Sequence, residues 1–179
     1  MKNITSKFLL VGFIIATFFS INACDDGYTI NTKKLLLEEQ ELMMDYYDLV
    51  SDTLKAVSYN VVDTADDKTF VYFELRQGTG DSVEVGDVVG FRYVFYEIVR
   101  DTTDTAFIYP YSSNYHSDEA FVYTVGNTST YQGGTYPGVD LALRNMAYGT
   151  KARVFIGSSL WNNDFTPRVV DLEVTYMEK

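Results

Sequence analysis

The stretch TYPGVDLALRNMAYGTKARVFI, residues 135–156, joins a tight turn, one short helix and a strand. Pro137-Gly138 predicts a turn at a helix start, where the fixed φ and the missing donor of proline cost little. The next apolar positions are spaced i, i+4 and i+7: Val139, Leu143 and Met146. This spacing predicts a helix with one narrow apolar face, which Gly149 is expected to end. Lys151 to Ile156 then alternates, so the stretch predicts a sheet that curls around one short helix.

The regions on either side of this stretch alternate with period two, as strands do. The expected strands are residues 70–76, 88–100, 121–125 and 169–177. In the last of these, four side chains would share one face: Val170, Leu172, Val174 and Tyr176. Together with residues 151–156 these segments predict an antiparallel α+β domain of about five strands.

An amphipathic helix is expected before this domain. Residues 33 to about 57 carry apolar side chains at helical spacing and contain no glycine or proline. We favour packing of this helix against the following domain over the binding of a partner. The polar run at 63–67 predicts a turn. We therefore assign residues 33–69 to an N-terminal helical extension and residues 70–179 to the main domain.

The first residues have the features of a secretory signal. Two lysines precede an apolar run at residues 8–19, which is too short to span a bilayer. The sequence Ile-Asn-Ala-Cys24 then resembles the processing box of bacterial lipoproteins, in which the cysteine is lipidated after cleavage on its N-terminal side. The sequence thus predicts a signal peptide at 1–23 and a lipidated tether at 24–32.

The expected lipid anchor indicates a position in the cell envelope, and we expect the outer membrane, on its periplasmic or surface face. The formal net charge is −11, and loss of Lys2 and Lys7 with the signal would change it to −13. Nucleic acid is therefore not an expected partner. The single cysteine excludes an internal disulfide.

Residues 70–179 contain a series of short motifs in a defined order. The set consists of Gly78-Thr79-Gly80, Gly86-Asp87-Val88-Val89, Tyr93, Phe121 to Gly126, Pro137-Gly138, Met146-Ala147-Tyr148-Gly149-Thr150-Lys151, Ile156-Gly157-Ser158-Ser159-Leu160 and Leu172 to Val174. In this order and spacing the set resembles the FKBP-type peptidyl-prolyl isomerases. The preceding helical segment resembles the N-terminal extension of lipoprotein members of that family. The resemblance implies a curled antiparallel sheet wrapped on one short helix.

The resemblance also implies cis/trans isomerisation of Xaa-Pro bonds in exported proteins, without a cofactor or a metal. Rotation about a peptide bond must cross a barrier of about 18–20 kcal/mol. The twisted transition state is less dipolar than the planar amide, so a dry aromatic pocket favours it over the ground state. The expected catalytic apparatus is therefore a pocket.

Four positions correspond to the pocket of the family. Tyr93 matches the strand tyrosine whose ring and hydroxyl line the site, and Phe121 matches the phenylalanine at its base. Tyr136 occupies the position whose backbone N–H binds the ligand carbonyl. Phe107 is the expected counterpart of a further pocket phenylalanine, across a long insertion.

The sequence also departs from the family pattern. Val139 stands where the family commonly has a tryptophan floor, and Leu172 replaces a phenylalanine of the last strand. A loop tyrosine of the family falls at Asn162, and the adjacent Trp161 is the candidate to fill the vacated floor. We therefore expect weak isomerase activity, or binding of proline peptides alone.

Two alternatives from other classes remain open. The protein would be a catalytically silent accessory subunit of an outer-membrane complex, or a surface glycan-binding lipoprotein. The aromatic and polar segment 108–116 is expected to be a loop, either a solvated flap or a recognition surface. His116 is the only histidine, which excludes a multi-histidine metal site, and we expect no metal.

Several Asp-Ser/Thr-apolar triplets resemble the acceptor of a bacterial periplasmic O-glycosylation system. The candidate acceptors are Thr64, Ser82, Thr102 and Thr105. They fall in expected turns or strand ends, where ordinary turn chemistry explains threonine and serine equally well.

Overall fold

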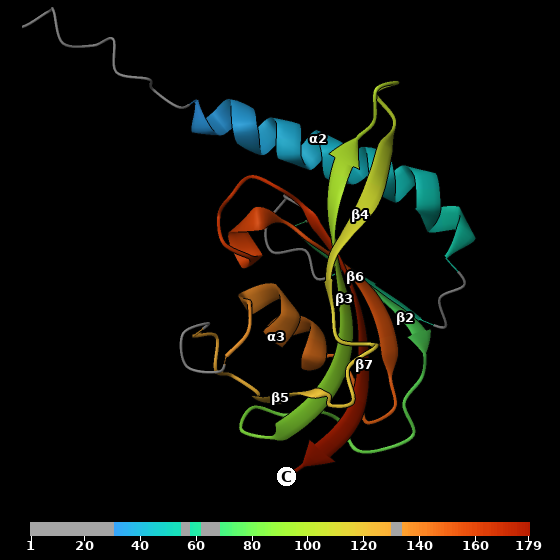
Figure 1. Cartoon of the computed structure of the whole chain (residues 1–179), viewed down its shortest axis with the longest axis vertical. Helices are drawn as coiled ribbons and strands as arrows, with labels where there is room; N and C mark the ends of the chain where they lie inside the picture. Colours follow the sequence, from blue (N-terminus) through green and yellow to red (C-terminus); the bar gives the residue numbers. More distant parts are fainter. Residues whose placement is uncertain (1–30, 55–57, 62–68, 130–133) are drawn as a thin grey trace, which may run out of the picture. The chain divides into compact units, whose positions relative to one another are not determined.

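Alternating runs of β-branched and aromatic residues form most of the structure. The computed structural model describes residues 31–54, 58–61, 69–129 and 134–179 (Figure 1). Its helices are α2 (Thr32–Val50) and α3 (Pro137–Leu143), with 3-10 turns at Ser51–Thr53 and Ser158–Leu160. Its strands are β1 (Ser58–Val61), β2 (Phe70–Arg76), β3 (Val88–Arg100), β4 (Ala106–Ser113), β5 (Phe121–Thr124), β6 (Lys151–Ile156) and β7 (Arg168–Glu178).

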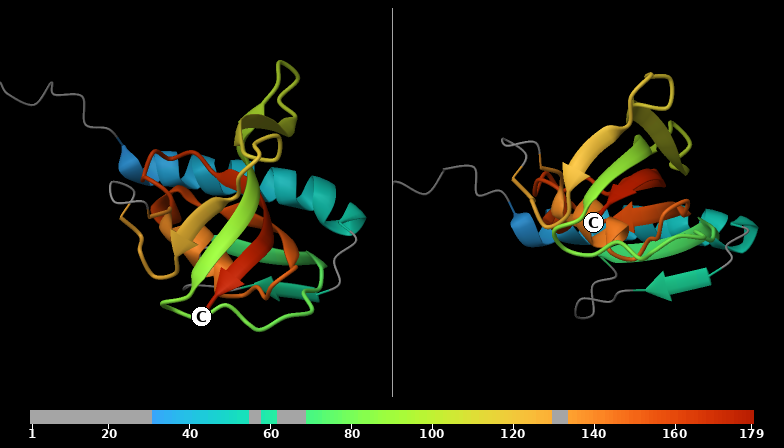
Figure 2. Two further views of the ribbon diagram at one scale, coloured as in Figure 1. Left: turned by 60° about the horizontal axis from the view of Figure 1, so that its bottom comes forward. Right: turned by 90° about the horizontal axis from the view of Figure 1, so that it is seen from below.

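Seven strands of the described residues form one antiparallel sheet in the order β1-β2-β6-β7-β3-β4, with β5 also paired to β3. The long strands β3 and β7 run side by side and curve strongly, as the views in Figure 2 show. On its other edge, β3 pairs with β5 up to Phe91 and with β4 from Val94 onward. Residues 92 and 93 therefore pair with neither strand on this edge.

Each face of the sheet has its own apolar core, because successive side chains of a strand point to opposite faces. On one face, α3 packs against residues from several strands, including Phe70, Tyr72, Phe91, Phe95, Val170 and Leu172. On the other face, Met43 and Tyr46 of α2 pack against Val71, Phe73, Ile98, Phe155 and Val169. The expected packing of the N-terminal helix on the domain and the expected sheet around one short helix are both confirmed.

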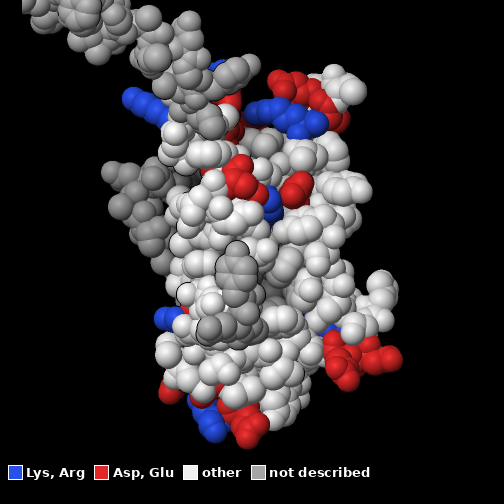
Figure 3. Space-filling view, turned by 60° about the vertical axis from the view of Figure 1, so that its left-hand side comes forward, with Lys and Arg blue, Asp and Glu red and all other residues white. Residues whose placement is uncertain are grey.

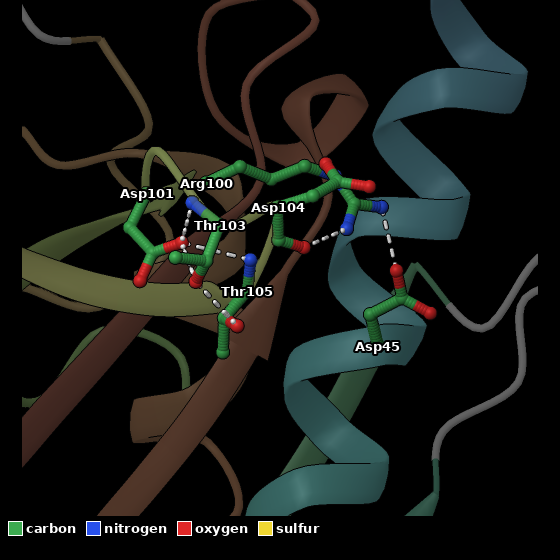
Figure 4. Close-up of polar contacts among 6 residues, drawn as sticks. All are labelled: Asp45, Arg100, Asp101, Thr103, Asp104 and Thr105. Atoms are coloured by element: carbon green, nitrogen blue, oxygen red, sulfur yellow. Dashed lines mark hydrogen bonds and ion pairs between the residues drawn. The ribbon is translucent and has the colours of Figure 1, made fainter.

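Two polar contacts fix α2 to the sheet face. The buried Glu39 carboxylate accepts hydrogen bonds from the Ser158 backbone N–H at 2.5 Å and from the Ser158 hydroxyl at 2.6 Å. Near the other end of α2, Asp45 accepts a hydrogen bond from Arg100 at 2.5 Å, just before the turn that joins β3 to β4 (Figure 4). The helix is thus held at the 3-10 turn after β6 and at the β3–β4 hairpin.

The expected strands 70–76, 88–100 and 151–156 have the observed bounds. The strand expected at 121–125 ends one residue earlier, and the strand expected at 169–177 is one residue longer at each end. Two strands were missed. Residues 58–61, assigned to the helical extension, form β1, which pairs with β2. Residues 108–113, expected in a loop, belong to β4, whose Pro110 and serines are weak strand signals.

Both helices end earlier than expected. The helix predicted to reach about residue 57 stops at Val50, where the Thr53 hydroxyl donates to the Val50 carbonyl at 2.8 Å. Serine, aspartate and threonine compete in this way for backbone groups and disfavour helix interiors. The helix α3 ends at Leu143 rather than near Gly149. Residues 146–148 instead form a short bridge with residues 81–83.

Candidate functional site

The first half of β3 provides the floor of an aromatic pocket on the α3 face. Phe91, Tyr93 and Phe95 alternate along the strand and point to the same face. The pocket has a volume of about 190 Å³ and is lined by Phe91, Tyr93, Phe95, Phe121, Gly134, Thr135 and Tyr136. It therefore lies between β3, β5 and the segment that leads into α3.

The aromatic side chains of the pocket hold one another in place. The ring of Tyr93 stacks on that of Phe95, with 4.1 Å between centroids and an interplanar angle of 23°. The Phe121 ring lies 5.4 Å from that of Phe91 and meets the Tyr93 ring edge to face at 6.5 Å. Aromatic contacts of this kind add to the energy of burial. The four rings consequently form the apolar part of the lining.

Two hydrogen-bond donors at the pocket have no acceptor among the residues that the structure describes. The carbonyl of Tyr136 accepts from the N–H groups of Val139 and Asp140 at 3.0 Å. Its own N–H donates to no acceptor within the described residues, and the same holds for the Tyr93 hydroxyl. A buried or half-buried donor needs a partner, so both groups can bind a carbonyl of a bound peptide.

Asn114 fills the gap that β4 and β5 leave beside β3. Its side-chain oxygen accepts the Tyr93 N–H at 2.7 Å, and its side-chain nitrogen donates to the Phe91 carbonyl at 3.0 Å. The guanidinium of Arg92 donates to the carbonyls of Asn114 at 2.6 Å and of Glu119 at 3.2 Å, and also to those of Ser117 and Asp118. The side chain of Asn114 thus takes the place of a strand residue and positions the backbone of the pocket floor.

A buried carboxylate connects β5 to α3. Asp140 accepts hydrogen bonds from the Tyr123 hydroxyl at 2.6 Å and from the Gly126 N–H at 2.7 Å, and it pairs with Arg144. Burial, together with the Asp140 carboxylate, raises the pKa of Tyr123 above its usual range. The phenol therefore stays neutral and donates, which fixes β5, and with it Phe121, relative to α3.

A buried arginine supports the pocket wall from behind. The Arg168 guanidinium lies 5.7 Å from the ring centroid of Tyr111 and 6.0 Å from that of Trp161. It donates to Asp164 at 2.6 Å, and Glu97 lies 3.3 Å away. Burial raises the pKa of Tyr111 to about 12, although the hydrogen bond and the charge of Arg168 act to lower it.

The structure brings three of the expected pocket residues together. Tyr93, Phe121 and Tyr136 line the pocket. Val139 and Leu172 are fully buried in the core beneath it, and neither contributes to its lining.

Trp161 and Phe107 lie elsewhere than expected. Trp161 does not replace the missing floor: it stacks on Tyr136 at 3.7 Å between centroids and meets Phe95 edge to face at 5.0 Å, so it backs the wall. Phe107 lies outside the pocket on β4, opposite Val99, because the insertion lengthens the β3–β4 hairpin.

The sequence analysis missed several contributors to the site, including the lining residues Gly134 and Thr135. Phe91 and Phe95 stand two positions either side of Tyr93, and the period of the strand could have identified them. Asn114 and Arg168 carry no such signal, because their roles depend on segments that are distant in sequence.

Three of the four O-glycosylation candidates lie in the described part of the chain, and all three are exposed. Thr102 and Thr105 lie exposed in the β3–β4 turn, where Asp101 accepts from the N–H and hydroxyl of Thr103 and from the N–H of Thr105 (Figure 4). Ser82 is exposed and bridges to Ala147. Thr64 and the lipidation candidate Cys24 lie outside the described residues. Modification at these positions stays a prediction.

Two further findings concern the described part of the chain. It contains no group of three or more His, Cys, Asp or Glu side chains that could hold a metal ion. None of its helices combines the length and the apolarity that crossing a bilayer requires.

Comparison with known proteins identifies the fold. No protein-family model matches the sequence, and no curated protein matches it. The structure is similar to a peptidyl-prolyl cis-trans isomerase from Pseudomonas syringae pv. tomato, with a TM-score of 0.53 and 21% identity over 86% of this chain and 100% of that one. It is also similar to FkpA from Escherichia coli, with a TM-score of 0.56 and 16% identity over 99% of this chain and 74% of that one.

The similarity extends to a plant protein. The N-terminal domain of FKBP42 from Arabidopsis thaliana has a TM-score of 0.51 and 13% identity over 68% of this chain and 93% of that one. At these identities the likeness concerns the fold. The chain has an FKBP-type α+β fold, in agreement with the resemblance of its motifs.

Proposed function

We propose that this protein binds Xaa-Pro segments of exported proteins in the aromatic pocket and isomerises them weakly. The observation that carries the proposal is an aromatic pocket within an FKBP-type fold, where the Tyr93 hydroxyl and the Tyr136 N–H have no acceptor in the described part of the chain.

Each part of the pocket has a separate task in this proposal. The rings of Phe91, Tyr93, Phe95 and Phe121 receive the proline ring and exclude water from the prolyl amide. Exclusion of water favours the twisted and less dipolar transition state over the planar amide. The Tyr136 N–H holds a flanking carbonyl, so that one side of the bond is fixed while the other rotates. No proton is transferred and no covalent intermediate forms.

Weak activity is proposed because the lining is incomplete. Val139 offers a small aliphatic side chain where the family commonly has a tryptophan, and it is buried below the pocket. Trp161 is engaged with Tyr136 and Phe95. Fewer aromatic surfaces then cover the prolyl amide, so the difference in solvation between ground state and transition state is smaller.

We also propose that the chain is a lipoprotein, anchored through Cys24 to the outer membrane. The basic start, the short apolar run and the cysteine box of the sequence support this placement. The proposed partners are then proline-containing segments of proteins that pass through the cell envelope. If the protein binds proline peptides without accelerating their isomerisation, we propose instead that it is a catalytically silent accessory subunit of a membrane complex.

Peptide exchange measured by NMR tests the proposed activity. The full-length chain in mild detergent is mixed with an Ala-Phe-Pro peptide, and the rate of cis/trans exchange is recorded. We expect faster exchange in the presence of the protein. Phe121→Ala is expected to lower the acceleration about tenfold, which corresponds to loss of about 1.4 kcal/mol of transition-state stabilisation.

The neighbouring residue on β5 provides a matched control. Val122 is exposed and faces away from the pocket, so Val122→Ala should leave the acceleration unchanged. Peptide-induced shifts of the pocket residues without acceleration would support a proline-peptide binder and reject the enzyme. Absence of both shifts and acceleration would reject the pocket as a site for proline.

A further inference from the structure

Three aromatic side chains extend from the pocket along the second half of the β3–β4 hairpin. Phe107, Tyr109 and Tyr111 occupy alternate positions of β4 and are 40%, 59% and 43% exposed. We call these three residues the aromatic strip. Exposed aromatic side chains that gather in one place indicate a binding surface more often than isolated ones do.

The strand register places the aromatic strip on the same face as the pocket. Tyr109 pairs with Glu97 and Phe107 with Val99, and both partners follow Tyr93 and Phe95 at intervals of two along β3. The alternate residues Ile98 and Ala106 pack on the opposite face, against α2. The aromatic strip therefore continues the line of the pocket floor.

A bulge joins the aromatic strip to the pocket. Between Pro110, which pairs with Tyr96, and Ser112, which pairs with Phe95, Tyr111 is an extra residue of β4. Its ring lies 6.3 Å from that of Phe95, which itself lines the pocket. From Tyr111 to Phe107 the strand spans about 13 Å, the length of four extended residues.

Acidic side chains outnumber basic ones along the aromatic strip. Glu97 and Asp164 are partly exposed, and the single cation between them, Arg168, is almost completely buried. At the far end, exposed Asp101 and Asp104 lie in the turn beside Arg100, which pairs with Asp45 at 2.5 Å and with Asp104 at 3.5 Å, so the one arginine faces three carboxylates (Figure 4). Figure 3 shows charged side chains gathered toward the ends of the α3 side, with mainly uncharged ones between them.

We propose that the aromatic strip binds an extended polypeptide segment, apolar and basic, that adjoins the proline held in the pocket. The proposal rests on the proposed function, because it takes the pocket as the site of the proline. Aromatic rings pack against apolar side chains of the segment and against the stems of its lysines or arginines. The carboxylates along the strip attract the basic groups, and continuity with the pocket allows one segment to occupy both.

Three peptides with the same Ala-Phe-Pro unit test the strip. The first is the short peptide alone, and the other two extend it by Leu-Lys-Phe-Lys on the N-terminal or the C-terminal side. Binding to the full-length chain in mild detergent is measured by NMR titration at low salt. We expect one extended peptide to bind about tenfold more tightly than the short one. Replacing its lysines by glutamates should remove that gain.

Protein variants separate the aromatic strip from the pocket. The double variant Phe107→Ser and Tyr109→Ser should bind the extended peptide no better than the short one, with binding of the short peptide unchanged. Tyr176→Ser serves as the control, since Tyr176 is equally exposed but pairs with Gly90 at the opposite end of β3. It should leave both affinities unchanged.

The outcomes distinguish the two proposals. If the short peptide binds and neither extension adds affinity, or if the double variant keeps the whole gain, the strip proposal is overturned and the pocket stands. If no peptide binds, both proposals are overturned.

Discussion

The two halves of β3 present the same alternation of side chains but differ in what covers them. In the first half, Phe91 and Phe95 are 1% and 8% exposed, because α3 and the segment before it lie over the same face. In the second half, the paired residues Tyr109 and Phe107 of β4 remain largely exposed. The same strand pattern thus yields a pocket flanked by the segment before α3 at one end and an uncovered surface at the other.

The difference does not arise from looser folding of the hairpin. The opposite face of its second half carries Ile98, which is fully buried, and Ala106, and both pack against α2. Arg100 also connects the hairpin to Asp45 of α2. The aromatic strip is therefore displayed on an ordered scaffold, as a binding surface requires.

The largest expected effect comes from truncating an aromatic residue at the boundary of the two halves. Phe95→Ala removes a buried ring that contacts Tyr93, Tyr111, Tyr136 and Trp161. We expect the free energy of unfolding to fall by about 3–5 kcal/mol, measured by urea denaturation. Phe107→Ala, in the exposed half, should cost less than about 1 kcal/mol. Equal losses in the two variants would contradict the contrast between the halves.

A moderate effect is expected from removing the side chain that positions the pocket floor. Asn114→Ala leaves the Tyr93 N–H and the Phe91 carbonyl without their partners. Loss of such half-buried hydrogen bonds should lower the free energy of unfolding by about 2 kcal/mol and weaken binding of the Ala-Phe-Pro peptide.

The variant Asn114→Asp separates the effects of the two hydrogen bonds that the Asn114 side chain makes. The aspartate keeps the acceptor for the Tyr93 N–H but lacks the donor to the Phe91 carbonyl. We expect a loss of stability with Tyr93 amide exchange still slow, whereas Asn114→Ala should accelerate that exchange. Unchanged hydrogen exchange at Tyr93 in the alanine variant would remove Asn114 as a positioning residue.

The smallest effect concerns alkaline pH at the junction of the two halves. Burial raises the pKa of Tyr111 to about 12, above its value of about 10 in an unfolded chain. Between these values the folded state binds more protons than the unfolded state, so the free energy of unfolding falls as pH rises. The contribution is complete below about pH 10 and is lost as pH passes about 12.

Tyr111→Phe tests this dependence by urea denaturation at pH 8, 10 and 11. Other buried tyrosines, such as Tyr123, give both proteins a common decline. The wild-type chain should show a slightly steeper decline than the variant, because Tyr111 is half exposed. A parallel decline would show that Tyr111 titrates equally in both states.

The sequence allowed much of the fold to be predicted and part of the site. Apolar spacing located α3 and its buried residues Val139 and Leu143, and Met146, which follows the helix, is also in the core. The same reasoning failed at β4, where Pro110 and several serines obscure a strand that its pairing with β3 stabilises. For the site, the family motifs indicated Tyr93, Phe121 and Tyr136, which line one pocket, but misplaced Phe107 and Trp161.

The sequence by itself determined the positions of the strands β2, β3, β5, β6 and β7, the apolar face of α3 and the motif order of an FKBP-type fold, because these depend on local periodicity and turn chemistry. The tertiary structure alone decided which aromatic residues are enclosed and which are displayed. Burial depends on the element packed opposite, and that element is distant in sequence: Gly134 to Tyr136 cover the floor formed by β3, and Asn114 and Arg168 hold its edges. Side-chain periodicity determines which residues share a face, and long-range packing determines whether that face contacts protein or solvent.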